Sequence, residues 1–229
     1  MDYDRIIAVS NDVAIYRHGN KRIKVFIQTN QFINALEESF KTQRVKELTN
    51  LNFTKTYSVG LKDNRVEILF DYIEGETLAQ KLKNDISKTR DIIIDLINLQ
   101  NKINSYINIL NCFKTVDNRA IAHFVGENPV LCHGDLSLDN VVITPTGELF
   151  VLNWEYAFEG DKKLDFASTY YSLYYAFSKD VADVYLDEYC NVNGESKVEL
   201  LNICALILGD LVSQAKGDKK AFLNELLKK

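Results

Sequence analysis

A polar turn between two apolar runs is the feature of this sequence that most constrains its fold. The block at residues 131–143 places Asp135 and Asn140 five residues apart between two predicted strands. A turn sequence at residues 145–147 then predicts a short hairpin that leads to Asn153, thirteen residues after Asn140. We expect this hairpin to fold back and bring Asn153 beside Asn140. The sequence thus predicts one carboxylate and two amide groups held together by a strand, a turn and a hairpin.

The groups of this block suit phosphoryl transfer. A carboxylate such as Asp135 can orient an attacking hydroxyl and accept its proton. Carboxylate and amide oxygens are also the ligands that Mg²⁺ prefers in proteins. Because phosphoryl transfer depends on positioning and charge neutralisation, it requires no covalent nucleophile.

The rest of the chain predicts an α+β fold with two lobes, residues 1–72 and 73–229. Alternating and helical spacings in the first lobe predict the order strand, strand, helix, strand, strand, over residues 12–18, 22–28, 31–49, 53–60 and 65–72. The second lobe begins with a short helix over residues 77–84. A long helix follows, with Ser87 as its predicted N-cap. Beyond Lys163 the sequence predicts helices to its end.

Composition excludes several classes of protein. The chain has 229 residues and a formal net charge of −5, with no basic stripe of the kind that binds nucleic acid. It has no apolar run long enough to span a membrane and no secretion signal, so we expect a cytoplasmic location. The widely spaced Cys112, Cys132, Cys190 and Cys204 predict reduced thiols rather than a zinc site or disulfides. The oligomeric state stays open.

The block and its surroundings resemble a known family. His133-Gly134-Asp135-Leu136, then Asn140, the hairpin, and Asn153-Trp154-Glu155 in place of the usual Asp-Trp-Glu are similar to the aminoglycoside phosphotransferase and choline kinase family. The resemblance implies a protein-kinase-like α+β fold, with a small sheet-plus-helix N-lobe and a mostly helical C-lobe. It also implies that ATP and Mg²⁺ bind between the lobes.

The first lobe extends this resemblance. Ile23-Lys24-Val25-Phe26 looks like the family's strand with a phosphate-binding lysine, which implies that Lys24 contacts the α- and β-phosphates. Glu38 stands where the family keeps the glutamate that pairs with this lysine. The linker residues Asp71, Tyr72 and Ile73 are then expected to touch the adenine. Strand alternation puts Arg22 and Lys24 on one face, and a solvated strand face is the alternative interpretation. A solvated helix acid is likewise the alternative for Glu38.

In the second lobe, the resemblance implies that Asp135 is the catalytic base and that His133 braces the catalytic loop. Asp165 is expected to hold that loop from below. The implied metal ligands are Asn140 and Asn153, with Glu155 nearby. Asn153 departs from the family, because an amide oxygen can bind Mg²⁺ but brings no negative charge.

Three explanations of Asn153 stay open. The chain can be a weak or inactive nucleotide binder, Glu155 can supply the missing carboxylate, or Asn153 can be an engineered replacement of an aspartate. The sequence does not choose among them.

These patterns predict an ATP-dependent kinase that phosphorylates a hydroxyl on a small molecule. Residues 155–190 hold eight acids against three lysines, together with many tyrosines. Acids and aromatic rings near an acceptor site suit a cationic amino alcohol such as choline, or an aminoglycoside, although a solvated acidic surface explains the same count. A pseudokinase that binds nucleotide or a partner protein without turnover is the alternative function. A protein kinase is disfavoured, because no long activation loop separates Asn153 from Asp165.

Overall fold

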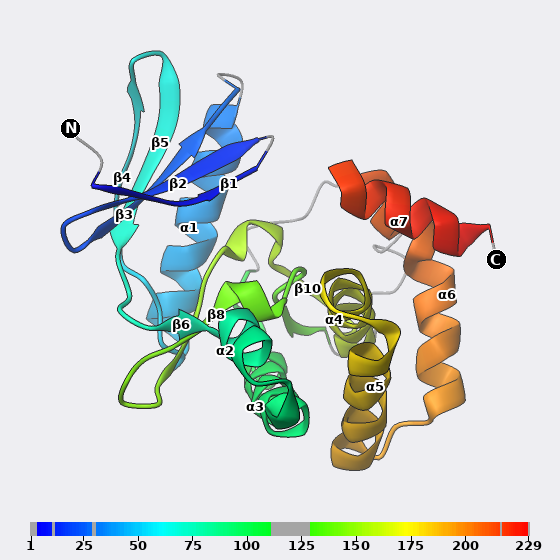
Figure 1. Cartoon of the computed structure of the whole chain (residues 1–229). Coiled ribbons are helices and arrows are strands. Elements are labelled where there is room, and N and C mark those ends of the chain that lie inside the picture. Colours follow the sequence, from blue (N-terminus) through cyan, green and yellow to red (C-terminus); the bar gives the residue numbers. More distant parts are fainter. Residues whose placement is uncertain (1–3, 11, 29–30, 111–128, 216, 229) are drawn as a thin grey trace. The chain divides into compact units, whose positions relative to one another are not determined.

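The chain, seen here as a computed structural model, divides into two compact units (Figure 1). The structure describes residues 4–10, 12–28, 31–110, 129–215 and 217–228. The N-terminal unit comprises residues 1–76 and 141–156, and the C-terminal unit comprises residues 77–140 and 157–229. The hairpin after the block at residues 131–143 thus groups with the N-terminal unit, whereas the sequence suggested a single division near residue 72.

The N-terminal unit is built on a five-stranded antiparallel sheet with the strand order β1-β2-β3-β5-β4. Its elements are β1 (Arg5–Val9), β2 (Val13–His18), β3 (Lys21–Phe26), α1 (Phe32–Leu48), β4 (Thr56–Lys62) and β5 (Arg65–Asp71). The predicted order of two strands, a helix and two strands is confirmed from β2 onward. β1 is a further strand that the sequence analysis did not assign.

The turns of this sheet follow from residues that tolerate positive φ. Gly19, with φ of 57°, closes the β2–β3 hairpin. Asp63 and Asn64, with φ of 48° and 61°, close the β4–β5 hairpin. Two consecutive residues with positive φ match the twist of the flanking strands, and Asn and Asp adopt this region more readily than other residues with side chains.

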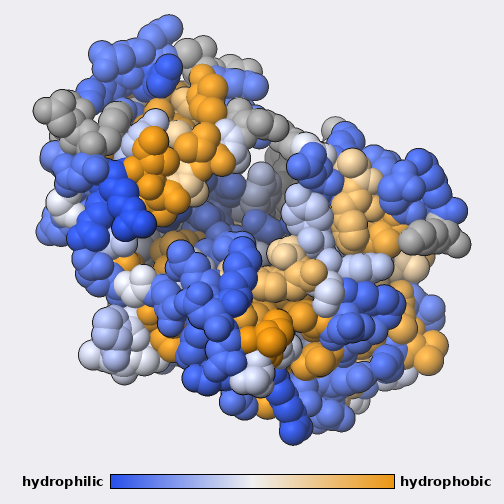
Figure 2. All heavy atoms as spheres, in the orientation of Figure 1, coloured by the Kyte–Doolittle hydropathy of each residue, from blue (hydrophilic) through white to orange (hydrophobic). Residues whose placement is uncertain are grey.

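Helix α1 covers one face of the sheet. Phe26, Val66, Ile68 and Phe70 from the strands pack with Ala35 of α1 in a buried cluster. β1, at the sheet edge, differs from the buried strands because its apolar side chains are exposed. Figure 2 shows apolar patches on the surface of this unit. The central strand β3 is therefore the buried part of the sheet, which places Arg22 and Lys24 in a desolvated environment.

A second hairpin completes the N-terminal unit. It consists of β8 (Val141–Ile143) and β9 (Leu149–Val151), followed by the 3₁₀ turn η5 (Trp154–Tyr156). Val151 bridges to Phe53, and the buried Trp154 ring lies 5.4 Å from the Phe53 ring. These contacts fix the segment that carries Asn153 and Glu155 against the N-terminal unit.

Replacing Gly75 by alanine is expected to destabilise the protein. A Cβ atom at Gly75 would lie 2.2 Å from the carbonyl oxygen of Ile143, a backbone atom that cannot swing away. We expect a loss of about 1–3 kcal/mol in the free energy of unfolding, as for other overpacked sites. Gly60→Ala is the matched control, because nothing lies within 4 Å of the added atom. Urea denaturation of both variants measures the difference, and equal stabilities would contradict the expected close approach.

The C-terminal unit is mostly helical. Its helices are α2 (Leu78–Asn84), α3 (Thr89–Asn104), α4 (Lys162–Ala176), α5 (Lys179–Asn193), α6 (Lys197–Gln214) and α7 (Gly217–Leu227). Between them lie the 3₁₀ turns η2 (Ile86–Lys88) and η4 (Leu138–Asn140) and the antiparallel strands β7 (Val130–Cys132) and β10 (Phe158–Gly160). The boundary between the units along the chain falls within the two-residue strand β6 (Glu76–Thr77). No helix in the described ranges has the length and apolar character needed to cross a membrane.

The helix starts only partly follow the sequence analysis. Thr77, the first residue of the predicted helix, caps α2 through a capping box with Gln80. The prediction that Ser87 caps the long helix is wrong. Ser87 instead lies within η2 and donates its hydroxyl and its N–H to Asp85, the N-cap of η2, and α3 begins at Thr89.

Candidate functional site

The predicted catalytic loop, residues 133–140 and called the catalytic loop below, holds Asp135 from two sides. The amide Nδ2 of Asn140 donates to the backbone oxygen of Asp135 at 2.7 Å and to its carboxylate Oδ2 at 3.2 Å. The backbone N–H of Asp135 donates to Nδ1 of the buried His133 at 3.3 Å. The Asp135 side chain remains 31% exposed. The loop therefore presents a carboxylate that is oriented by its neighbours and still accessible.

Asp165 of α4 anchors this loop from within the C-terminal unit. Its carboxylate accepts the backbone N–H groups of His133 at 3.1 Å and Gly134 at 2.8 Å. Burial raises the pKa of Asp165, and His133 and the two backbone donors partly offset this effect. Two further α4 side chains, Ser168 and Thr169, donate to carbonyl oxygens of the same loop. The loop conformation is thus set by a buried carboxylate and one helix face.

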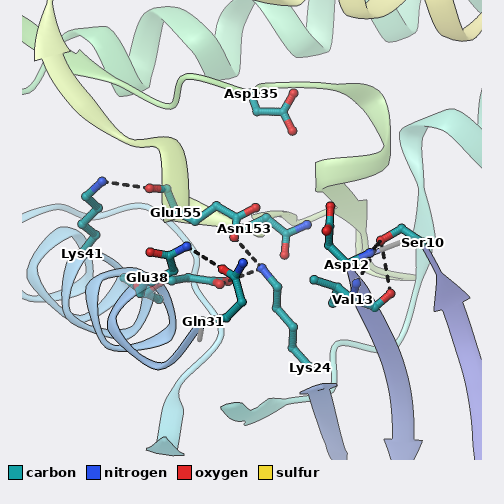
Figure 3. Close-up of polar contacts among 12 residues, drawn as sticks. Ser10, Asp12, Val13, Lys24, Gln31, Glu38, Lys41, Asp135, Asn153 and Glu155 are labelled. Carbon is teal, nitrogen blue, oxygen red and sulfur yellow. Dashed lines mark hydrogen bonds and ion pairs between the residues drawn. The ribbon is translucent and has the colours of Figure 1, made fainter. Parts of the chain in front are cut away.

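Lys24 of β3 lies between two carboxylates of the N-terminal unit (Figure 3). Its Nζ is 2.7 Å from Oε2 of Glu38 on α1 and 2.8 Å from Oε2 of Glu155. Lys24 and Glu38 are 3% and 1% exposed. Burial disfavours the charged form of Lys24, but the two carboxylates outweigh it, so the pKa of Lys24 is raised. Lys24 and Glu38 are therefore a buried ion pair and not the solvated surface residues of the alternative interpretation.

Asn153 has a different partner from the one that its position implied. Its Oδ1 accepts a hydrogen bond of 2.7 Å from Nη2 of Arg22, which lies two residues before Lys24 on β3. Asn153 adopts φ of 60°, a left-handed conformation that asparagine tolerates. The side chain is thus fixed toward the sheet by a guanidinium group.

These contacts do not suit a Mg²⁺ ion held by Asn153 and Glu155. The Asn153 oxygen faces a positively charged donor, and the Glu155 carboxylate pairs with Lys24. Among the residues that the structure describes, no three His, Cys, Asp or Glu side chains are grouped closely enough to hold a metal ion. Asn140, the remaining implied ligand, belongs to the C-terminal unit and donates to Asp135.

The linker residues lie at the end of β5, with contacts of their own. The carboxylate of Asp71 is 2.9 Å from Lys21 Nζ and accepts the Tyr57 hydroxyl at 2.8 Å. The Arg17 guanidinium stacks over the Tyr72 ring, 4.1 Å from its centre. Ile73, the third residue of this linker, is partly exposed. Asp71 and Tyr72 are thus held by basic and aromatic side chains of the N-terminal unit.

Two cations that were not predicted as site residues, Arg22 and Lys219, lie beside residues that were. Strand alternation in the sequence did place Arg22 on the same face as Lys24, but its partner Asn153 is 131 residues away along the chain. No sequence pattern indicated Lys219 of α7. Its Nζ lies 3.6 Å from Oδ1 of Asp135 and donates to Ser172 on α4 at 3.1 Å. Only the folded C-terminal unit brings this lysine to the catalytic loop.

The acidic segment that suggested a cationic acceptor is largely engaged in structural contacts. Glu155 pairs with Lys24, and Asp165 holds the loop. The others with partners are Glu159 with the Ile109 N–H, Asp161 as the α4 cap, Asp183 with Lys179, Asp187 with Lys197 and Glu188 with Arg90. Asp180 lies in the first turn of α5. These acids therefore account for the charge count without a ligand.

Three tyrosines of α4 line a pocket in the helical unit. Tyr170, Tyr171 and Tyr174 line a pocket of about 500 Å³ with residues of α6 and α7. At 100° per residue, Tyr170 and Tyr174 lie on the side of α4 opposite Ser168 and Ser172, which contact the loop and Lys219, and Tyr171 lies between the two sides. The pocket is thus a separate feature of the helical unit, and Tyr185 and Tyr189 of α5 are fully buried core.

Three free cysteines lie in the described part of the chain, namely Cys132, Cys190 and Cys204. The prediction of unpaired thiols holds for them. Cys112 lies outside the described residues.

Comparisons with known proteins agree with the resemblance. The model of the phosphotransferase enzyme family, APH, matches residues 109–201. No curated protein matches the chain.

Solved structures of aminoglycoside phosphotransferases share the fold. A thermostable mutant of APH(4)-Ia, in a ternary complex with AMP-PNP and hygromycin B, superposes with a TM-score of 0.67 at 12% identity, over 99% of this chain and 93% of that one. The streptomycin–ATP–APH(2")-IIa complex gives a TM-score of 0.57 at 16% identity, over 92% and 82%. At such identities the likeness establishes the fold, so the predicted α+β kinase-like fold is confirmed.

Proposed function

We propose that this chain, whose residues 109–201 match the phosphotransferase enzyme family, binds ATP and transfers its γ-phosphoryl group to a hydroxyl of a small molecule. The observation that carries the proposal is the catalytic loop. Asp135 is oriented by Asn140, its loop is anchored on Asp165, and its carboxylate is accessible. A carboxylate so held can orient an acceptor hydroxyl and take its proton as the new phosphate ester forms.

The other nominated residues receive roles in the same proposal. Lys24, kept charged by Glu38, would neutralise phosphate oxygens of the nucleotide. Asp71, Tyr72 and Ile73 would contact the adenine, and His133 and Asp165 would fix the loop. Similar structures hold AMP-PNP or ATP, which supports ATP as the phosphoryl donor. The assay described below is run with and without Mg²⁺, because the contacts of Asn153 and Glu155 do not suit this ion. The proposal includes the cytoplasmic location expected from the sequence, and no nucleic-acid partner.

The class of acceptor that we propose is wider than the cationic amino alcohols suggested by the number of acidic residues. Similar structures contain hygromycin B or streptomycin, which supports a polyhydroxylated small molecule and keeps cationic amino alcohols among the candidates. Lys219, however, places a positive charge 3.6 Å from Asp135. A like charge next to the reacting hydroxyl is unfavourable. We therefore favour an acceptor whose group beside the hydroxyl is neutral or anionic.

A pseudokinase is the second candidate function. The contact between Arg22 and Asn153 favours it, because the residues at that position do not suit the metal that assists phosphoryl transfer. Such a protein would bind nucleotide without phosphorylating an acceptor.

One assay separates these functions. The full chain is incubated with γ-labelled ATP and either glycerol, glycerate or serinol, which share a three-carbon skeleton but differ in charge. Choline, ethanolamine and kanamycin extend the panel, and each reaction is run with Mg²⁺ and with EDTA. We expect label in an acceptor, with glycerol or glycerate preferred over serinol. ATP binding without transfer to any compound in the panel or in a cell extract would favour the pseudokinase.

A further inference from the structure

A buried arginine occupies the position where the resemblance implies a metal site. Arg22 is 6% exposed, and its Nη2 donates to Oδ1 of Asn153 at 2.7 Å. The oxygen is the only atom of the Asn153 side chain that can bind a cation. The guanidinium therefore faces the one atom through which Asn153 would hold a metal.

A divalent ion and this guanidinium would compete for the same place. Mg²⁺ binds an oxygen at about 2.1 Å. With Arg22 at 2.7 Å from the same oxygen, two positive groups would share one neutral ligand. An aspartate could offset that repulsion with its negative charge, whereas the amide of Asn153 cannot. The replacement of aspartate by asparagine and the presence of Arg22 thus form a consistent pair.

The charges around Lys24 support this interpretation. Three buried cations, Arg22, Lys24 and Lys41, accompany two carboxylates, Glu38 and Glu155. Lys41 Nζ donates to the backbone oxygen of Glu155 at 2.8 Å, so it belongs to the same cluster. The cluster carries one net positive charge without any metal. An aspartate at position 153 would cancel that charge and leave the neutralisation of phosphates to a divalent ion.

We propose that Arg22 takes the place of the divalent cation, so that this chain binds the polyphosphate of a nucleoside triphosphate without Mg²⁺. The proposal rests on the nucleotide site of the proposed function. A guanidinium presents five N–H donors in a planar fork, and the contact with Asn153 uses one of them. This geometry matches phosphate oxygens and holds their charge without a metal. Asn153 orients the guanidinium rather than binding an ion.

Calorimetric titration of the full chain with ATP tests this inference, in excess EDTA and in excess MgCl₂. We expect the two dissociation constants of the unmodified chain to agree within about threefold, since no metal is needed to neutralise the phosphates. Arg22→Met should weaken binding in EDTA roughly tenfold or more, as expected for loss of a charged phosphate contact. Arg65→Met, which removes an exposed arginine of β5, is the matched control and should leave both constants unchanged.

Asn153→Asp provides a reciprocal test. The new carboxylate would pair with Arg22 and withdraw its charge from the phosphates. Binding in EDTA should then weaken, while added MgCl₂ restores it. Circular dichroism establishes that each variant folds. If Arg22→Met does not fold, Arg22→Lys keeps the charge but loses the fork, and it should also weaken binding in EDTA.

The outcomes separate this inference from the proposed function. ATP binding by the unmodified chain in MgCl₂ but not in EDTA would overturn the inference and leave the kinase proposal standing. Equal loss of affinity in Arg22→Met and Arg65→Met would overturn it as well. No ATP binding under either condition would overturn both proposals.

Discussion

Replacing Asp135 by asparagine is expected to lower the rate of phosphoryl transfer by about 100- to 10,000-fold, the contribution typical of a positioned general base. An amide at this position can still accept a hydrogen bond from the acceptor, but it cannot take the proton. Because Asn140 holds the Asp135 backbone oxygen as well as its side chain, the loop should keep its conformation. The dissociation constant for ATP should therefore change little while the rate falls.

Asp139→Asn is the matched control for this experiment. Asp139 lies in the same loop, is exposed and carries the same charge. Single-turnover transfer from labelled ATP measures the chemical step in both variants. Equal rates for Asp135→Asn and the unmodified chain would show that Asp135 is not the base and would remove the observation on which the proposed function rests.

The largest effect on stability is expected for Lys24→Met. This change leaves Glu38 buried without its principal partner, and breaking a buried ion pair by removing one member costs about 3–5 kcal/mol. Glu38 is 1% exposed, so water cannot replace the lost charge. Because the pKa of Lys24 is raised, its stabilising contribution is complete below the ordinary value of 10.5 and is lost only as pH rises beyond it. Urea denaturation at pH 7 therefore measures the contribution in full.

A neighbouring ion pair supplies the control. Lys21 on the same strand pairs with Asp71, and these side chains are 21% and 33% exposed. Lys21→Met should cost about 1 kcal/mol or less, as for other solvated pairs. The double variant Lys24→Met/Glu38→Leu should recover part of the loss, since it removes the stranded carboxylate. Similar losses for Lys24→Met and Lys21→Met would contradict a desolvated Lys24–Glu38 pair.

Arg22 illustrates the limit of local pattern. The alternation of β3 places Arg22 on the same face as Lys24, but the same pattern is equally consistent with a solvent-exposed strand face. What makes Arg22 buried is the central position of β3 in the sheet together with Asn153, which comes from a segment 131 residues further along the chain. The sequence alone showed that an amide at position 153 brings no negative charge to a metal site. It did not show that Arg22 is the group beside this amide.

The charge of the acceptor was also difficult to predict from local sequence. A count of acids along residues 155–190 suggested a cationic acceptor, but such a count does not show where each carboxylate points. In the folded unit most of these carboxylates pair with lysines, arginines or backbone N–H groups, whereas Lys219 from α7 stands beside Asp135. Charge summed over a segment is a weak guide to a site, because each side chain points to one place only.

The sequence by itself determined the local structure of this protein and the identity of its chemical groups. Turn residues that tolerate positive φ, the Thr77 capping box and the spacing of Asp135 and Asn140 act over a few residues, so their physical effect can be read directly. Only the tertiary structure decided which charges are desolvated and which partners neutralise them. Those energies depend on burial and on contacts between distant segments, as between Arg22 and Asn153 or Lys219 and Asp135, and no local pattern encodes them.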